Sequence, residues 1–458
     1  MTFTRLVMLL MAFFIVSNIS AQEKKDAKKE KEKSSKETIK KGWNLGALPV
    51  ISYDSDLGFQ YGALMNLYNY GNGKDYPNYR QSLYMEVSRF TKKSGIYRIN
   101  YDTKDLIKGK RVYIDLSYMP DQAYSFYGFN GYDAVYNESW ITPGNAQYKT
   151  KMFYKYQRKF FRFKIDLQGK VKSVNHLFWD VGAGVYNIKT GPVDLAILNK
   201  GKSGNNLLPN VPGLYSKYLD WGIIRQNEKA GGTFTVFKAA LEYDSRDNEA
   251  NPNKGIWTEI VLAAAPKFTS TMSDGFYKLS ITHRQYFSIV KNKFFFDYRL
   301  GAQFNIGGYT PFYALPMIFF AHSTKAYNEG LGGSGNLRGV LRNRVIGNGI
   351  MYGNFEFRWK VLPFHFINQN FYIGLVSFFD SGMVIQKYKF NEPTNASVYS
   401  PNTKSDYFKS NAEKLHNSVG GVLIIAMNEN FIVSVTHGRA LNSQDGTSGT
   451  YIGLNYLF

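Results

Sequence analysis

The sequence predicts an all-β fold, a transmembrane antiparallel β-barrel of about 16 strands with a glycine-rich loop folded inward. Three observations lead to this prediction. Aromatic residues make up 17% of the 458 residues and glycine occurs 42 times, a composition that suits many twisted strands joined by turns. Several segments alternate apolar and charged residues with a period of two. After the N-terminal segment, no apolar run has the length of a membrane-spanning helix, so a membrane crossing would need the fully paired backbone of a closed barrel.

Residues 1–21 have the pattern of a secretory signal peptide. Arg5 supplies the positive charge, residues 6–16 form an apolar core, and Ala21 offers a small residue for cleavage before Gln22. The alternative, a retained membrane anchor, needs a longer apolar run than this one. We therefore expect export and cleavage before Gln22.

Residues 22–41, QEKKDAKKEKEKSSKETIKK, form a charged segment of low complexity. The segment has no apolar stripe and cannot bury enough apolar surface to offset its conformational entropy. We expect it to be a disordered or loosely helical periplasmic tail, and we expect the barrel to occupy residues 42–458.

The alternation assigns about 16 strands to that barrel. The first eight are expected at 43–53, 58–70, 79–92, 95–106, 110–118, 147–170, 176–189 and 232–245. The second eight are expected at 255–267, 276–289, 294–306, 349–361, 370–384, 417–427, 431–439 and 449–458. Because the number is even, both ends of the barrel domain are expected on the same, periplasmic, side.

Two of these strands show the alternation most clearly. In 294–306, one face is apolar: Phe296, Tyr298, Leu300, Ala302, Phe304 and Ile306. The other face is polar or small: Asp297, Arg299, Gly301, Gln303 and Asn305. Segment 351–361 alternates in the same way, and its polar face includes Glu356 and Arg358. Such strands have lipid on one face and a polar interior on the other. A soluble sandwich would also alternate, but the signal peptide and the C-terminus argue against it.

The connections between the strands follow a one-sided pattern. Long connections at 119–146, 190–231, 307–348 and 385–416 all fall on one side of the barrel, and short turns such as 428–430 fall on the other. Outer-membrane barrels have long external loops and short periplasmic turns. The pattern therefore favours an outer-membrane barrel with these four loops outside.

The C-terminal segment, 451–458, contains Tyr451 and Gly453 and ends with Tyr456 two residues before Phe458. One face of this strand is apolar: Ile452, Leu454, Tyr456 and Phe458. An aromatic terminal residue in this pattern resembles the signal by which outer-membrane barrels are recognised for insertion. The alternative is an ordinary terminal strand. Together with the signal peptide, the segment predicts the outer membrane of a Gram-negative bacterium.

A strand–turn–strand pattern spans 241–247 and 251–255. Asp and Asn side chains cap tight turns, Pro fixes φ, and Gly accepts positive φ. We interpret the segment as a periplasmic turn. The alternative, a metal-binding or catalytic cluster of Asp244, Asp247 and Glu249, is less favoured.

The stretch 332–340 reads GGSGNLRGV and is too rich in glycine for a regular element. Glycines such as Gly339 allow it to fold back and deliver the guanidinium of Arg338 to a specific place. Two carboxylates are available, Glu356 in the next strand and Asp380 in the strand after it, and neither can face lipid. We predict charge-assisted bonds from Arg338 to both acids, the alternative being a solvated loop arginine.

The order of loop, acidic strand and acidic strand resembles the BamA/TamA outer-membrane protein family, the bacterial surface-antigen barrels. Segments 241–255 and 378–382 (Phe-Phe-Asp-Ser-Gly) add to the resemblance, which covers mainly residues 241–458. It implies that the loop packs inside the barrel, with Arg338 and Gly339 anchored against Glu356 and Asp380. Leu337 replaces a usual Val or Ile and Val340 a usual aromatic residue, so we expect different packing around the anchor.

The family commonly carries periplasmic POTRA domains. Residues 22–41 are too few for one, so we interpret the sequence as that of a POTRA-less member. The resemblance implies a barrel that assists insertion or translocation of outer-membrane proteins or lipids, as a subunit of a larger complex or with other outer-membrane or periplasmic proteins as partners. The alternative is a structural or pore-forming barrel without insertase activity.

Pro49 lies in the first expected strand, which pairs with the last one where the barrel closes. Proline cannot donate a ladder hydrogen bond, so it belongs on an edge or a weakly paired strand. A weak seam is what lateral opening in this family would require. The alternative is a harmless proline near a strand end.

The formal net charge is +21, and the basic residues are spread through the alternating strands. We interpret them as a cationic lumen and rim that contact outer-membrane lipids and lipopolysaccharide, and we expect no nucleic-acid partner. The six histidines are scattered and cysteine is absent. We therefore expect neither enzymatic activity nor a metal or other cofactor.

Overall fold

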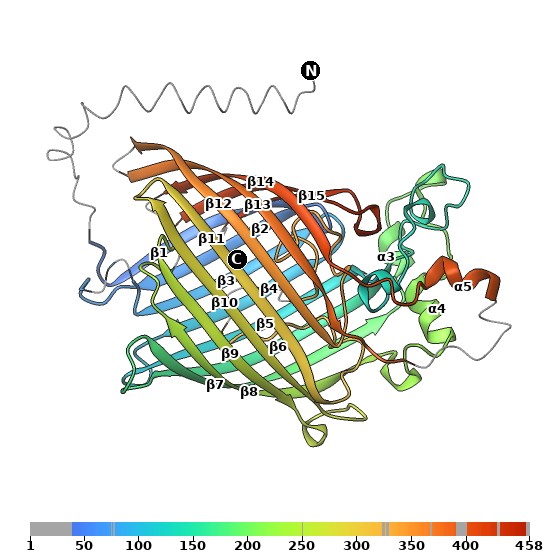
Figure 1. Ribbon diagram of the computed structural model, residues 1–458, viewed down its shortest axis with the longest axis horizontal. Coiled ribbons are helices and arrows are strands. Elements are labelled where there is room, and N and C mark those ends of the chain that lie inside the picture. The colour runs from blue at the N-terminus through green and yellow to red at the C-terminus, as the bar shows by residue number, and fades with distance from the viewer. Residues whose placement is uncertain are drawn as a thin grey trace.

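A computed structural model describes residues 39–74, 76, 78–249, 251–322, 326, 329–366, 369–390, 401–427 and 431–454. Within these residues the chain forms a closed antiparallel barrel of sixteen strands, in which β1 pairs with β16 (Figure 1). The predicted fold class is confirmed. The expected signal peptide and residues 22–38 of the expected tail lie outside the described residues. None of the described helices has the length and apolar character needed to cross a membrane.

The strands follow one another around the barrel in chain order. The first eight are β1 (Trp43–Asp54), β2 (Gly58–Asn69), β3 (Gln81–Phe90), β4 (Gly95–Thr103), β5 (Lys110–Ser125), β6 (Lys155–Lys170), β7 (Leu177–Gly191) and β8 (Gly231–Asp244). The second eight are β9 (Gly255–Ala265), β10 (Phe276–Val290), β11 (Phe294–Gly308), β12 (Gly349–Phe366), β13 (Gln369–Gln386), β14 (His416–Met427), β15 (Phe431–Ala440) and β16 (Ser448–Leu454).

The expected strand ranges differ most from the structure at β5 and β6. β5 continues to Ser125 instead of ending at 118, and β6 begins at Lys155 instead of 147. The extension of β5 is held by Asp121, a buried residue whose Oδ1 accepts from Ser94 Oγ at 2.8 Å. Residues before Lys155 leave the strand because Phe153 and Tyr154 are buried among the loops. The first long connection is therefore 126–154, not 119–146.

The two faces of the strands separate by polarity as predicted. On β11, Leu300 and Phe304 are exposed outward while Asp297 and Arg299 are buried. β12 repeats the pattern, with Phe357 exposed and Glu356 fully buried. An apolar outer face and a polar, filled interior are the arrangement of a membrane barrel.

The long connections gather at one end of the barrel and include three short helices, α3 (Leu195–Asn199), α4 (Leu214–Asp220) and α5 (Pro401–Tyr407) (Figure 1). Residues 126–154, 192–230, 387–390 and 401–415 form what we call the loop cap. Aromatic rings pack between its segments: the rings of Phe126 and Tyr218 lie 5.3 Å apart and those of Trp140 and Tyr407 5.0 Å apart. The apolar core of the cap is thus continuous with buried residues of the strands, such as Phe160 and Phe234.

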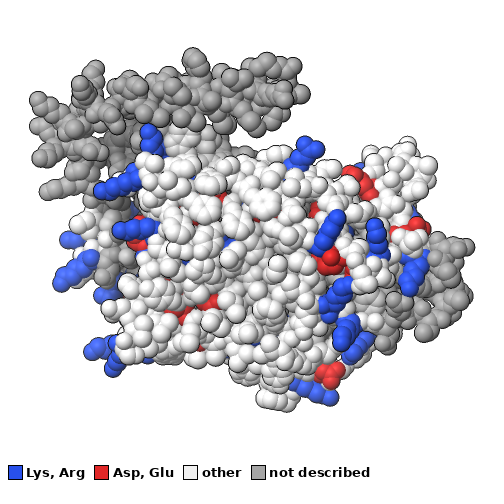
Figure 2. All heavy atoms as spheres, in the orientation of Figure 1, with Lys and Arg blue, Asp and Glu red and all other residues white. Residues whose placement is uncertain are grey.

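The predicted cationic lumen is wrong for the buried residues that the structure describes. Buried carboxylates outnumber buried cations there, thirteen to eleven. The acids are Glu86, Asp102, Asp115, Asp121, Asp166, Asp180, Glu228, Glu242, Glu259, Asp297, Glu356, Asp380 and Asp445. The bases are Arg98, Arg158, Arg162, Lys164, Lys278, Arg284, Arg299, Arg338, Arg342, Arg344 and Arg358. A buried charge needs a partner, so cations accumulate in number only where water solvates them. Figure 2 shows Lys and Arg gathered toward the two ends of the barrel surface.

Candidate functional site: a loop inside the barrel

The loop between β11 and β12, residues 309–348, folds back and runs inside the barrel. Isolated β-bridges join Met317 to Glu329 and Leu331 to Val345, so the loop doubles back on itself. The segment that follows Gly330 is almost entirely buried. We call residues 330–345 the inner loop.

Asn336 shapes the glycine-rich turn of the inner loop. Its side-chain oxygen accepts the backbone N–H groups of Gly332 and Leu337, both at 2.8 Å. Its side-chain nitrogen donates to the carbonyl of Gly330 at 2.7 Å. One amide side chain therefore satisfies three backbone groups that a glycine-rich turn leaves without ladder partners.

Arg338 lies at the centre of the inner loop and bonds to two strands of the barrel. Its Nε and its backbone N–H both donate to Oδ2 of Asp380, at 2.8 and 3.0 Å, and its Nη2 donates to Oδ1 at 2.8 Å. Its Nη1 donates to Oε1 of Glu356 at 2.6 Å. The side chain of Arg338 is 8% exposed and both carboxylates are 0% exposed. The structure thus brings together the three side chains that the sequence singled out, as a buried bidentate ion pair with a second acid alongside.

Neighbouring side chains complete this ion-pair network. Asn354 Nδ2 donates to Asp380 Oδ1 at 2.8 Å and also bonds the carbonyl of Asn336. Arg358 Nε donates to Glu356 Oε2 at 2.7 Å, so Glu356 is shared between two guanidinium groups. The guanidinium of Arg338 also lies 3.7 Å from the ring centre of Phe378. These contacts all come from β12 and β13, which we call the anchor wall.

Gly339 brings the backbone of the inner loop against β15. Its φ is +93°, and a Cβ placed there would lie 2.4 Å from the carbonyl carbon of Gly438. A Cβ on Gly438 would in turn lie 2.4 Å from the carbonyl oxygen of Arg338. Two glycines facing each other therefore allow backbone-to-backbone contact that no other residue pair permits.

Leu337 and Val340, the two positions that depart from the family pattern, both make apolar contacts between the inner loop and the barrel. Leu337 and Val340 are buried and belong to a cluster with Leu331, Val345 and Ile350. The cluster fills the space between the inner loop and the first residues of β12. Leucine and valine thus supply apolar packing on either side of the Arg338–Gly339 pair.

The seam between β1 and β16 is registered at Tyr53 opposite Ile452 and Asp54 opposite Tyr451 among the described residues. Ser55 adds three bonds to Thr450: its N–H and its Oγ donate to the carbonyl at 3.1 and 3.0 Å, and its Oγ accepts the Thr450 N–H at 2.6 Å. By contrast, β12 and β13 are registered along their whole lengths. The described seam is therefore short.

The inner loop also contacts both sides of this seam. The N–H of Gly339 donates to the hydroxyl of Tyr451 on β16 at 3.3 Å. Ser334 Oγ donates to Oδ2 of Asp54 on β1 at 3.3 Å, and the N–H of Arg342 donates to Oδ1 of Asp56 at 3.4 Å. The loop thus spans from the anchor wall to the far side of the seam.

A second anchor, which the sequence reasoning missed, ties the inner loop and the preceding Glu329 to the opposite wall. Arg158 on β6 makes two bonds to Glu329, the longer at 2.9 Å. Arg342 Nη1 donates to Oδ2 of Asp121 on β5 at 2.9 Å. Two sequence features point to this anchor: Arg158 lies on the inward face of its strand, and Arg342 follows Arg338 in the same loop. These features could not identify the partners, because the sequence analysis ended the strand of Asp121 at residue 118.

A third anchor joins the inner loop to the loop cap. Arg344 is fully buried, and its nitrogens donate to the carbonyls of Gly131, Ala134 and Gln444 at 2.9, 2.9 and 2.7 Å. Asp445, near Arg344, accepts from Tyr132 Oη at 2.5 Å and bonds His416 Nδ1 at 2.6 Å. These contacts fix the cap on top of the inner loop. No sequence pattern indicates them, because most of the acceptors are backbone carbonyls.

At the other end of the barrel, the β8–β9 turn reaches across the lumen instead of remaining a simple turn. Glu249 lies 3.1 Å from Arg111 on β5, and that guanidinium lowers the pKa of Glu249 to about 2. Asn251 Nδ2 donates to Tyr372 on β13 at 2.9 Å. The turn assignment of Asp244, Asp247 and Glu249 fits this geometry. In the described part of the chain, no group of three or more His, Cys, Asp or Glu side chains could hold a metal ion.

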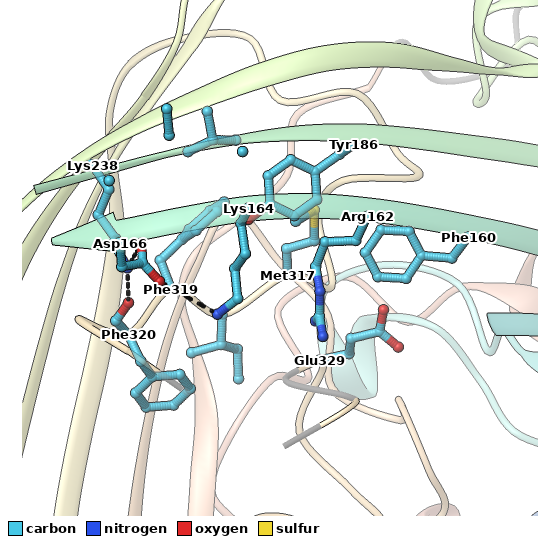
Figure 3. A pocket seen from close by; sticks show the side chains of 15 residues that line it. Phe160, Arg162, Lys164, Asp166, Tyr186, Lys238, Met317, Phe319, Phe320 and Glu329 are labelled. Atoms are coloured by element: carbon cyan, nitrogen blue, oxygen red, sulfur yellow. Dashed lines mark hydrogen bonds and ion pairs between the residues drawn. The ribbon is translucent and has the colours of Figure 1, made fainter. Parts of the chain in front are cut away.

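A cavity of about 50 Å³ remains between the β11–β12 loop, before the inner loop begins, and the wall formed by β6, β7 and β8 (Figure 3). Lys164, Asp166 and Lys238 line it from the strands, and Phe319 and Glu329 line it from the loop. Lys238 Nζ lies 2.8 Å from Asp166 Oδ1. Space of this size holds a few water molecules and is far too small for a polypeptide or a lipid.

The residues expected at the seam and in the insertion signal are placed only in part. Pro49 is exposed in β1 and pairs with Ala63 on the β2 side. Gly453 lies in β16, and Tyr451 faces inward toward the inner loop. Tyr456 and Phe458 lie outside the described residues.

Comparisons with known proteins give one family model and one shared fold. The Omp85 superfamily domain matches residues 106–451. The crystal structure of BamA from Haemophilus ducreyi lacking POTRA domains 1–3 is similar with a TM-score of 0.51 and 13% identity, covering 91% of this chain and 70% of that one. CdiB from Escherichia coli is similar with a TM-score of 0.55 and 10% identity, covering 91% of this chain and 64% of that one. At these identities the two structures show a shared barrel fold. No curated protein sequence matches.

Proposed function

The chain belongs to the Omp85 superfamily, and on this premise we propose that it assists the insertion or translocation of outer-membrane proteins or lipids. It is an outer-membrane protein of Gram-negative type, and barrels of this superfamily act in the insertion or secretion of outer-membrane proteins. Members are transporters or insertases, and we propose a non-enzymatic role here too. The loop cap then faces the outside, as long loops do in such barrels.

The observation that carries this proposal is the reach of the inner loop across the seam. Arg338 holds the loop on the anchor wall through charged bonds, while Tyr451, Asp54 and Asp56 touch it from the two sides of the seam. A loop in this position can hold β1 and β16 together when it is seated. It can remain on the anchor wall when the two strands separate.

The filled lumen supports a route through the seam instead of through the barrel. The inner loop occupies the interior, the loop cap packs over one end, and the β8–β9 turn crosses near the other. The cavity beside the loop has room for only a few water molecules. An incoming strand or lipid would therefore enter at the β1–β16 seam, where exposed backbone could pair with it.

The remaining sequence assignments complete the proposal. Residues 1–21 would direct export, residues 22–41 would lie in the periplasm, and residues 42–458 would form the barrel. The tail and the periplasmic rim would contact other outer-membrane or periplasmic proteins. Tyr451, Gly453, Tyr456 and Phe458 would act as the signal for the barrel's own insertion.

Depletion of the protein, followed by quantitative profiling of the outer membrane, tests the function. Under the proposal, specific barrel proteins or lipids decline in the outer membrane while their precursors accumulate. Unchanged levels of every other barrel and lipid would favour the alternative, a structural or pore-forming barrel.

A disulfide lock tests the route. The protein has no cysteine, and directly opposed residues of an antiparallel pair lie at roughly 4.5–5.5 Å between Cα atoms, within disulfide range. We expect a Tyr53→Cys/Ile452→Cys variant to fail to complement the depletion when oxidised and to recover on reduction. A Leu423→Cys/Val435→Cys variant places the same lock between β14 and β15 and serves as the control. Full complementation by the oxidised seam lock would exclude opening at this seam.

A further inference from the structure

Two lysines stand directly opposite each other on the outer face of the barrel. Lys159 on β6 pairs in register with Lys189 on β7. Their neighbours along each strand, Arg158 and Ile188, are fully buried, so strand parity turns the two lysines outward. Directly opposed side chains have Cβ atoms at roughly 4.5–5.5 Å, and like charges in such a pair repel each other.

No acid in the described residues offsets this repulsion. Neither lysine takes part in any ion pair, hydrogen bond or ring contact with another described residue. Asp194, the next carboxylate along the chain from Lys189, instead accepts the N–H of Ile197 at 3.0 Å and caps α3. A third cation adds to the charge: Lys229 is exposed, and its backbone carbonyl accepts from Thr190 Oγ1 at 2.9 Å.

The lysine pair lies at the upper border of the apolar belt. One step toward the membrane centre, Phe161 pairs with Asn187, and the next step pairs Phe163 with Val185. These aromatic and aliphatic side chains are exposed on the outer face, as lipid-facing residues are. The pair therefore lies on the loop-cap side of the belt, at the depth where the headgroups of the outer leaflet begin.

We propose that Lys159 and Lys189 form a binding site for a phosphate group of a glycolipid in the outer leaflet. A phosphate between two ammonium groups converts their repulsion into two charge-assisted hydrogen bonds. The acyl chains of the same lipid then lie against Phe161, Phe163 and Val185. Lys229, whose backbone is bonded to Thr190 next to Lys189, adds a third positive charge to this region. The proposal rests on the loop cap facing outward and does not depend on opening of the seam.

The test measures binding of diphosphorylated lipid A and of the same lipid without phosphate to the purified, folded barrel by native mass spectrometry. We expect the intact protein to prefer the phosphorylated lipid. A lysine near an anionic surface contributes roughly fivefold in affinity, so Lys159→Gln/Lys189→Gln should weaken binding roughly 20- to 30-fold. Lys159→Arg/Lys189→Arg keeps the charge and should retain most of the affinity.

The matched control is Lys170→Gln/Lys172→Gln, which removes two exposed lysines at the opposite end of β6. It should leave lipid A binding unchanged. Equal loss in the control, or equal binding of the dephosphorylated lipid, would overturn the proposal. Displacement of the lipid by millimolar inorganic phosphate would identify a site for free anions and would overturn it as well.

Discussion

The inner loop is held very differently on its two sides. On the anchor wall, Arg338 makes four bonds of 2.6–3.0 Å to two fully buried carboxylates. On the seam side, three uncharged donors reach Tyr451, Asp54 and Asp56 at 3.3–3.4 Å. Hydrogen bonds to charged groups at short distance are stronger than long ones from neutral donors. The difference shows that charged bonds hold the loop on the anchor wall, as they also do on β5 through Arg342 and Asp121, whereas its bonds to the seam are long and have uncharged donors.

This asymmetry has a mechanical consequence. If the seam opens, the contacts that break are the weak ones, and the buried ion pair stays intact. A loop bound with equal strength on both sides would either block the opening or leave the wall during it. The arrangement therefore suits a barrel whose first and last strands separate while its loop stays in place.

Breaking the anchor wall is expected to have the largest effect. Arg338→Ala leaves Asp380 buried without its cation, which costs roughly 3–5 kcal/mol in the free energy of unfolding. Asp380→Asn strands the guanidinium and should cost nearly as much. The double variant should be little worse than either single one, because the two residues act as a pair. Heat-dependent mobility shift of the folded barrel on gels measures the loss.

Arg439→Ala is the control for the anchor, since Arg439 is an exposed arginine on β15. Its removal should leave the unfolding temperature unchanged. Fully additive losses in Arg338→Ala/Asp380→Asn would contradict the assignment of one buried pair.

An intermediate effect is expected where the loop passes β15. Gly339→Ala places a Cβ 2.4 Å from backbone atoms of Gly438 at a φ of +93°. Gly438 lies in β15 and cannot move away without disturbing that strand, so we expect a loss of roughly 1–3 kcal/mol in the free energy of unfolding. Gly335→Ala, where nothing lies within 4 Å of the new Cβ, is the matched control. The same gel assay should show a clear shift for the first variant and none for the second; equal shifts would mean that the close approach is irrelevant.

Strand positions and the Arg338 anchor were predictable because their causes are local. A charged side chain in a membrane strand must face inward, so parity alone assigns the faces of Glu356 and Asp380. The glycine-rich stretch predicts which loop folds inward, and the single arginine within it, Arg338, predicts which cation the acids bind. These inferences needed no knowledge of which strands lie across the lumen.

The other anchors were not predictable because they join segments far apart in the chain. The pairing of Arg158 with Glu329 depends on how the loop crosses the lumen, and Arg344 bonds backbone carbonyls that carry no sequence signal. Pro120 and Asp121 have the pattern of a turn, so the strand expected at 110–118 ends before them, too early by comparison with β5. The strand continues past them because Pro120 pairs with Lys159 and Asp121 is held by Ser94 and Arg342.

The smallest effect on stability is expected on the seam side, and this expectation tests the comparison most directly. Tyr451→Phe removes the acceptor of the Gly339 N–H, and Ser334→Ala removes the donor to Asp54. Both bonds are long, at 3.3 Å, and neither has a charged donor, so each contributes only about 1 kcal/mol and the unfolding temperature should change little. The seam should nevertheless open more often, because each of these bonds resists separation of β1 and β16 while it is present. Hydrogen exchange at the Tyr53 and Ile452 amides should therefore accelerate several-fold, while amides of β12 and β13 keep their rates. Tyr352→Phe, which removes a buried hydroxyl on the anchor wall, should not change exchange at the seam. Two outcomes would contradict the comparison: Tyr451→Phe destabilising the barrel as much as Arg338→Ala, or leaving exchange at the seam unaltered. Either would mean that the loop does not hold the seam through weak hydrogen bonds.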